Sequence, residues 1–252
     1  MLGIFITAGY PDRSTTVEAL KVLDSEGVEL IELGVPFSDP LADGPAIQNA
    51  SFKALEQGTN LDEVFSIYKE ADISTKTILF SYYNPLHAYG FDRVIEKCKE
   101  TGISGTLIPD LPVDEAEDLV TKFREAGLDL VLLAAITSTD DRLKKIAELS
   151  SPFVYLVSRV GVTGSSDEAK SLKGDAAETE GSNEVLKSQI AKLREYGAGQ
   201  VAIGFGIDSA DKVSQTLELA DMAIVGSKAI KVLEQEGSTG LQKFVAGLKQ
   251  HH

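Results

Sequence analysis

Residues 32–48 read ELGVPFSDPLADGPAIQ, and they combine the end of a strand, a loop and the start of a helix. The strand is the nearly continuous apolar run VELIELGV at 28–35, which is typical of a parallel strand buried on both faces. The loop contains Pro36, Pro40 and Pro45, and the pattern after it predicts an amphipathic helix. A strand, a loop and a helix in succession form the repeating unit of α/β proteins.

Two carboxylates in this stretch are the candidate catalytic residues. Glu32 interrupts the apolar strand near its carboxyl end, where a carboxylate is costly unless it is paired or used. Asp43 lies at the far end of the loop. In an α/β barrel, polar residues at the carboxyl ends of strands point into the active site. The alternative interpretation is that Glu32 pairs with a buried Arg or Lys.

Short apolar runs alternate with amphipathic helical patterns along the whole chain, which favours βα units and a parallel sheet. Such units, without a Gly/Ser linker and within 252 residues, predict one (βα)8 TIM barrel over residues 1–250. An open doubly wound sheet is the alternative, because spacing alone cannot show closure. The eight predicted strands are Ile4–Thr7, Leu30–Leu33, Thr77–Phe80, Thr106–Ile108, Leu130–Leu133, Val154–Val157, Val201–Ile203 and Met222–Val225.

Capping patterns predict three helix starts, one of them an extra helix inside the second βα unit. Each pattern has a Ser, Thr or Asn followed three residues later by a carboxylate. The pairs are Thr15 with Glu18, Ser138 with Asp141 and, for the extra helix, Asn60 with Glu63.

Composition limits the class of protein. A formal net charge of −15 argues against nucleic acid and anionic membranes as partners. The chain has one cysteine, Cys98, so no internal disulfide can form, which indicates a cytoplasmic protein. Cys98 itself is expected to be a half-buried core residue. No signal peptide or membrane-length apolar run is visible. His251 and His252 resemble a tag remnant.

Glycine-bearing turns follow the last three predicted strands, at Gly161–Gly164, Gly204–Gly206 and Gly226–Ser227. Barrel enzymes often bind phosphate with loops in this region and a helix amino terminus. The turns predict a phosphate site whose residues are Thr163, Gly164, Gly206, Gly226 and Ser227. Lys228 is either a further phosphate contact or a solvated lysine.

Apolar and aromatic residues at strand ends predict a pocket for a flat aromatic ligand. Its expected lining is Phe5, Tyr82, Leu107, Leu133, Tyr155 and Phe205. His87 is expected at the surface, and the spacing of His, Cys and carboxylates predicts no metal site.

Seven motifs in order resemble the tryptophan synthase alpha chain family over nearly the whole sequence. Besides residues 32–48, they are FITAGYP at Phe5–Pro11, SYYNP at Ser81–Pro85, PDLP at Pro109–Pro112, SRVGVTG at Ser158–Gly164, GFGI at Gly204–Ile207 and VGS at Val225–Ser227.

This resemblance implies a lyase that splits indole-3-glycerol phosphate into indole and glyceraldehyde 3-phosphate by retro-aldol cleavage. By position, Glu32 is the implied acid and base, Asp43 holds the indole N–H, and Tyr155 lies beside the reacting centre. The resemblance also implies that Arg159 orients a lid. The family usually has Ser or Thr where this chain has Val160.

The resemblance also implies a beta-chain partner that carries pyridoxal phosphate, whereas no cofactor is expected on this chain. The loop Pro36–Asp43 and the segments near Asn84 and Pro109–Pro112 would face that partner. Two alternatives stay open: another phosphosugar enzyme on the same scaffold, and a subunit that mainly activates its partner.

Two features depart from the family. The first strand lies at the start of the sequence, without the helix that usually covers the amino-terminal mouth of the barrel, so that mouth is expected to be partly uncovered. Residues 165–182 are polar, charged and longer than usual, which predicts a mobile loop.

Overall fold

Eight parallel strands close into a barrel in the computed structural model, which describes residues 1–157, 180–204 and 206–249. Closure comes from β1, which pairs with both β2 and β8, so that Gly3 lies between Leu30 and Ile224. The predicted TIM barrel is therefore confirmed, and the open sheet is wrong. The strands are β1 Leu2–Thr7, β2 Leu30–Gly34, β3 Thr77–Phe80, β4 Gly105–Leu107, β5 Asp129–Ala135, β6 Val154–Val157, β7 Val201–Ile203 and β8 Met222–Val225.

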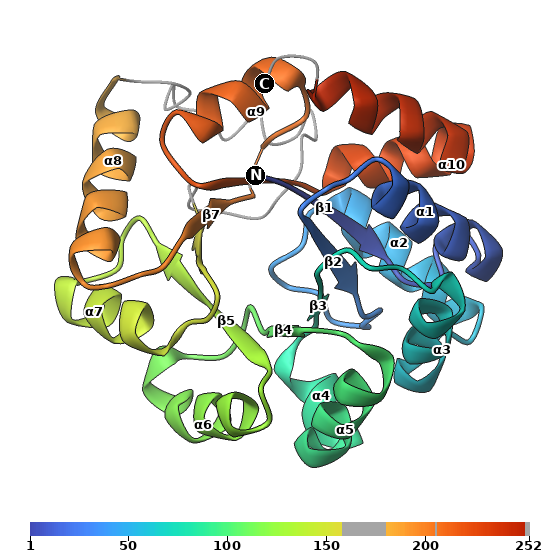
Figure 1. Cartoon of the computed structure of the whole chain (residues 1–252), viewed down its shortest axis with the longest axis horizontal. Coiled ribbons are helices and arrows are strands. Elements are labelled where there is room, and N and C mark those ends of the chain that lie inside the picture. The colour runs from blue at the N-terminus through green and yellow to red at the C-terminus, as the bar shows by residue number, and fades with distance from the viewer. Residues whose placement is uncertain (158–179, 205, 250–252) are drawn as a thin grey trace.

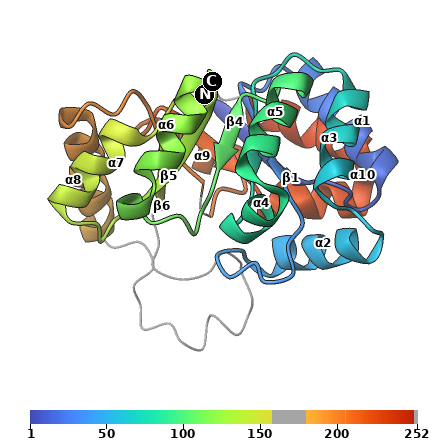
Figure 2. The ribbon, with the colours of Figure 1, turned by 90° about the horizontal axis from the view of Figure 1, so that it is seen from below.

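Helices surround the strands as an outer ring (Figure 1). Two helices follow β2 and two follow β3, where α4 and α5 are separated by Gly90 at φ 93°. Figure 2 shows α2 at the end of the barrel opposite the amino terminus. The helices are α1 Arg13–Ser25, α2 Pro45–Glu56, α3 Leu61–Ala71, α4 Tyr83–Tyr89, α5 Phe91–Thr101, α6 Glu117–Glu125, α7 Asp140–Leu149, α8 Glu180–Glu195, α9 Ala210–Leu217 and α10 Ser227–Lys249, with a 3₁₀ turn η1 at Val113–Glu115.

Two of the predicted helix caps are wrong. Asp12, not Thr15, caps α1, because its carboxylate accepts the Thr15 N–H at 2.8 Å. The start of α7 lies at Asp140, because the Ser138 hydroxyl instead accepts the Ala135 N–H at 3.0 Å and closes the turn after β5.

The extra helix is confirmed. It is α3, and the Asn60 side chain accepts the Glu63 N–H at its amino terminus at 3.1 Å.

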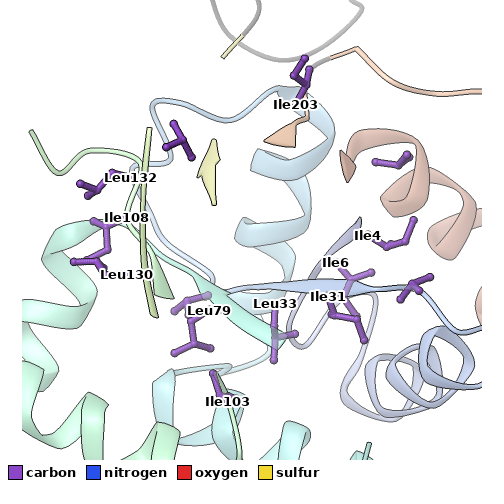
Figure 3. Packing of buried hydrophobic residues seen from close by; sticks show 14 of the residues in the cluster. Ile4, Ile6, Ile31, Leu33, Leu79, Ile103, Ile108, Leu130, Leu132 and Ile203 are labelled. Carbon is purple, nitrogen blue, oxygen red and sulfur yellow. The ribbon is translucent and has the colours of Figure 1, made fainter. Parts of the chain in front are cut away.

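The two faces of the strands pack into different clusters of buried residues. Residues such as Ile4, Ile31 and Leu79 point outward and pack against the helices (Figure 3). The alternate residues fill the barrel: Leu30, Ile78, Leu107, Val131, Phe153, Tyr155, Ala202, Met222 and Ile224. Because side chains alternate along a strand, this register also directs Glu32 into the barrel, two positions beyond Leu30.

Two expectations about the ends of the barrel need correction. The amino-terminal mouth is filled, because Leu30, Phe153 and Met222 are buried and the half-buried Met1 packs against their cluster.

Of the predicted loop at 165–182, residues 165–179 lie outside the described residues, and the remaining positions belong to α8, which begins at Glu180. His251 and His252 also lie outside the described residues. None of the described helices is long and apolar enough to cross a membrane.

Candidate active site

Glu32 lies inside the barrel on β2, in register with Phe5 of β1 and Ile78 of β3. The residue is 1% exposed, and its Oε1 atom has no hydrogen-bond partner. Burial, followed by the nearby charge of Asp43, raises the pKa of Glu32 to about 8. Within the described residues no cation acts on this carboxyl, which speaks against the structural ion pair considered for it. Glu32 is therefore protonated at neutral pH.

Asp43 closes the loop between β2 and α2. Its N–H donates to the Pro40 carbonyl at 3.0 Å, and Gly44 follows as the N-cap of α2. The residue is 6% exposed, and burial raises the pKa of its carboxyl to about 7, while the Tyr82 hydroxyl acts in the opposite direction. The structure therefore places two buried carboxyls with raised pKa values close enough to influence each other.

Tyr82 approaches the same loop from the neighbouring βα unit. It follows β3 as the N-cap of α4, and its side chain is buried. The hydroxyl accepts the Ala42 N–H at 2.8 Å, and the ring centroid lies 5.3 Å from that of Phe37. Tyr82 thus contacts both the beginning and the end of the loop that carries Asp43.

Tyr155 lies on β6, between Leu133 of β5 and Ala202 of β7. Burial, then the charges of Glu32 and Asp43, raises its pKa well above the usual value. A Cβ atom added at Gly204 would lie 1.7 Å from the Tyr155 hydroxyl oxygen. Gly204 therefore makes the space in which this tyrosine lies.

Phe5 on β1 is in register with Glu32 on β2. Its ring meets Phe80 edge-on, with the centroids 5.3 Å apart and the planes at 84°. A Cβ atom at Gly34 would lie 2.6 Å from the Phe5 ring, so this position needs glycine for that ring arrangement. Leu107 is fully buried and belongs to the inward-facing cluster, against which Leu133 packs.

The turns predicted to bind phosphate are described in part. Gly206 has a φ of 77°, a conformation that favours glycine. Gly226 and Ser227 lead into α10, whose first intrahelical bond joins the Ile230 N–H to the Gly226 carbonyl at 3.1 Å. The backbone N–H groups before Ile230 lack acceptors within the helix, which suits an anion. Lys228 is exposed beside them.

Several predicted site residues lie outside the described residues and stay predictions: Thr163, Gly164 and Phe205, with Arg159 and Val160 of the lid. The structure adds two residues that sequence reasoning missed: Phe80, which packs against the inward-facing cluster, and Gly34, which lies against the Phe5 ring. Phe80 could have been found from its alternation with Ile78 along β3. Gly34 carried no signal beyond ending the strand, because its role depends on a ring from another strand.

His87 and Cys98, neither of which was predicted to belong to the site, have different surroundings. His87 is exposed, as predicted, and stacks on Tyr83 at 5.6 Å between centroids. Cys98 is fully buried, so the expectation of a half-buried residue is wrong, and burial raises the pKa of its thiol to about 12. No group of three or more His, Cys, Asp or Glu side chains in the described part of the chain is arranged to hold a metal ion.

Comparison with known proteins adds a family to this geometry. A family model described as tryptophan synthase alpha chain matches residues 2–251. The tryptophan synthase alpha chain of Synechocystis sp. is 42% identical over 97% of this chain and 90% of its own length. That of Arabidopsis thaliana is also 42% identical, over 97% of this chain and 87% of its own length.

Solved structures agree with the sequence relatives. A structure of Mycobacterium tuberculosis tryptophan synthase superposes with a TM-score of 0.85 at 30% identity, covering 98% of this chain and 90% of the other. The alpha subunit from Campylobacter jejuni gives 0.86 at 26% identity, covering 98% and 94%. The chain therefore belongs to the tryptophan synthase alpha chain family, and it is a lyase-type subunit of tryptophan biosynthesis that cleaves indole-3-glycerol phosphate.

Proposed function

We propose that Glu32 is the acid and base of this cleavage. The observation that carries the proposal is a fully buried carboxyl with a pKa near 8 and one oxygen without a hydrogen-bond partner. Such a group holds a proton at neutral pH and can deliver it to a substrate atom in a site that excludes water. An unused carboxyl in this position would only destabilise the fold.

The proton balance fits one carboxyl acting twice. Glu32 first gives its proton to the indole ring carbon that carries the glycerol phosphate chain. The resulting carboxylate then takes the proton of the chain hydroxyl, the carbon–carbon bond breaks, and its electron pair returns to the ring. The products are indole and glyceraldehyde 3-phosphate, and Glu32 ends protonated, as it began.

Asp43 is the acceptor for the indole N–H in this proposal. Positive charge develops on the ring when the ring carbon is protonated, and a carboxylate beside the N–H stabilises it. Burial raises the pKa of both carboxyls, and the nearby charge of Asp43 raises that of Glu32 further, whereas the Tyr82 hydroxyl lowers that of Asp43. Two carboxyls in such different surroundings can divide the acid and acceptor roles.

The remaining predicted residues divide between the two ends of the substrate. The indole would lie among Phe5, Tyr82, Leu107, Leu133 and Tyr155. The phosphate would bind the backbone at Gly206, Gly226 and Ser227, together with Thr163 and Gly164; Phe205 would lie between the two regions. Support comes from the inward-facing cluster that contains Leu107, Leu133 and Tyr155, and from the N–H groups at the start of α10, which have no acceptor within the helix.

A partner is also proposed, a beta subunit that carries pyridoxal phosphate and receives the indole. Support comes from the alpha chain family and from the related structures, which are of tryptophan synthase. Leu41, 82% exposed on the Asp43 loop, and the exposed Tyr83 would lie in the contact. The roles proposed for this chain need no cofactor of its own. The single buried thiol fits a cytoplasmic enzyme.

One assay tests the central proposal: indole release from indole-3-glycerol phosphate, with and without a beta chain. Glu32→Gln keeps the size of the side chain but cannot cycle a proton. Its kcat should fall by about 10² to 10⁴-fold, with KM little changed. Substantial indole release by Glu32→Gln would remove Glu32 from the mechanism.

A further inference from the structure

Two side chains from different elements fix the peptide segment around Asp43. The Tyr82 hydroxyl accepts the N–H of Ala42 at 2.8 Å. The Gln48 amide nitrogen donates to the Asp43 carbonyl at 2.9 Å and lies 3.4 Å from the Pro40 carbonyl. The backbone bond from the Asp43 N–H to Pro40 completes a set of contacts on both sides of one residue.

These contacts hold a part of the loop that has little packing of its own. Leu41, two positions before Asp43, is 82% exposed and contributes little packing of its own. Asp43 is 6% exposed, so the chain passes from solvent to a buried position within two residues. Loops carry few internal constraints and depend on such side-chain contacts for a defined geometry. Tyr82 is itself held, because its buried ring packs against Phe37.

We propose that Tyr82 and Gln48 are positioning residues that together hold the Asp43 carboxylate where it accepts the ring N–H. The inference rests on the role proposed above for Asp43 and adds what fixes it. A charged acceptor stabilises a transition state only when it is preorganised, and a displacement of about 1 Å can cost about 10²-fold in rate. Gln48 belongs to the helix that the loop enters, and Tyr82 belongs to the next βα unit.

The two residues act on Asp43 in different ways, which makes them separable. Among the described residues, the Gln48 amide donates to the backbone carbonyls of Pro40 and Asp43, so it influences position and not the ionisation of the carboxyl. Tyr82 fixes the backbone at Ala42 and also interacts with the carboxyl, where its hydroxyl lowers the pKa of Asp43. Loss of that hydroxyl should therefore raise the pKa of Asp43 and move the acid limb of the kcat profile to higher pH.

The test uses Tyr82→Phe and Gln48→Leu, each with a matched control elsewhere in the chain. Tyr89→Phe removes a tyrosine hydroxyl that contacts Asp62, on the surface between α4 and α3. Gln57→Leu removes an amide that donates to the Pro11 carbonyl at 2.7 Å. Steady-state indole release, its pH profile and thermal unfolding are measured for all four, and for Asp43→Asn.

Each positioning variant should lower kcat by about 10 to 100-fold with little change in KM, whereas both controls should stay near the parent. Only Tyr82→Phe should move the acid limb upward in pH. The double variant should lose less than the product of the two single losses, because both changes release the same segment. Gln48→Met removes the same donor without adding a charge and replaces Gln48→Leu if that variant does not fold.

The outcomes separate this inference from the proposed function. If Asp43→Asn is inactive while Tyr82→Phe and Gln48→Leu keep the parent kcat, the positioning role is overturned and the role of Asp43 stands. If Asp43→Asn keeps the parent kcat, the proposed role of Asp43 fails first. Equal losses in the controls and in the positioning variants would reduce the effect to general stability and overturn the inference.

Discussion

The Glu32 carboxyl imposes a cost on the fold that depends on pH. The same group titrates near 4.5 when solvated and near 8 in the folded protein. Between these values the folded state keeps a proton that the unfolded state has released, so the free energy of unfolding falls as pH rises. This cost is absent below about pH 4.5 and is complete once the pH has passed about 8. Asp43 likewise lowers the free energy of unfolding as the pH rises from 3.8 to about 7.

Glu32→Gln should therefore make the protein more stable at pH 8 although its kcat is much lower. The gain should be a few kcal/mol at most, since each pH unit of pKa shift corresponds to about 1.4 kcal/mol. The gain should shrink toward zero near pH 4.5, where Glu32 is protonated in both states. Urea unfolding of parent and variant at both pH values measures the difference. Parallel stability curves across this range would show that Glu32 ionises normally in the fold.

At the scale of elements, the turns after β7 and β8 bring backbone rather than side chains to the proposed phosphate. Gly226 is the sharper position to test, because Gly206 has a positive φ and any substitution there is strained. Among the described residues, the nearest atoms that a Cβ at Gly226 would meet belong to Phe5 and Ile47, at 3.5 Å or more. The space is sufficient for alanine and progressively less so for larger side chains.

Gly226→Ala and Gly226→Val should raise KM for the phosphorylated substrate in that order, with valine reaching about tenfold or more, which equals about 1.4 kcal/mol. The affinity for free indole should change much less, because indole carries no phosphate. Gly247→Ala, on the same helix with no neighbour within 4 Å, is the control. An unchanged KM in both Gly226 variants would remove this turn from the phosphate site.

The accuracy of the predictions made from the sequence also differs from one element to the next. Apolar runs located every strand within a few residues, because burial on both faces leaves little choice of residue type. The start of α1 was misplaced because Asp12, a nearby carboxylate, competes with Thr15 for the cap. Glu32 and Asp43 stood out as carboxylates in an unusual context. Gly34 and Gln48 did not, because their contacts join segments whose proximity only the folded chain determines.

For the molecule as a whole, the two carboxyls differ in what surrounds them. Glu32 is anchored in a strand, with neighbours on both sides in register. Asp43 ends a loop whose middle, at Leu41, is exposed and available to a partner. Asp43, and not Glu32, therefore belongs to the segment through which occupancy of this site could reach the proposed beta subunit.

Asp43→Asn should weaken mutual activation between the subunits, whereas Glu32→Gln should leave it largely in place, although both lose indole release. Beta-chain turnover is measured with each variant in the presence of a non-cleavable phosphorylated ligand. The expected loss of activation in Asp43→Asn is about 5-fold or more, within the usual range of coupling between sites. The same loss in Glu32→Gln would refute this division.

The pairing of β1 with β8 has a consequence for how the chain is made. Ile4 pairs with Val225, so the partner of one edge of β1 leaves the ribosome long after β1 itself. Until then the unpaired N–H and C=O groups of a strongly apolar strand, LGIFIT, lack their final neighbour. Closure also waits for contacts of long sequence separation, which form slowly. The nascent chain is thus exposed to misassembly at β1, the strand that carries Phe5 of the proposed active site.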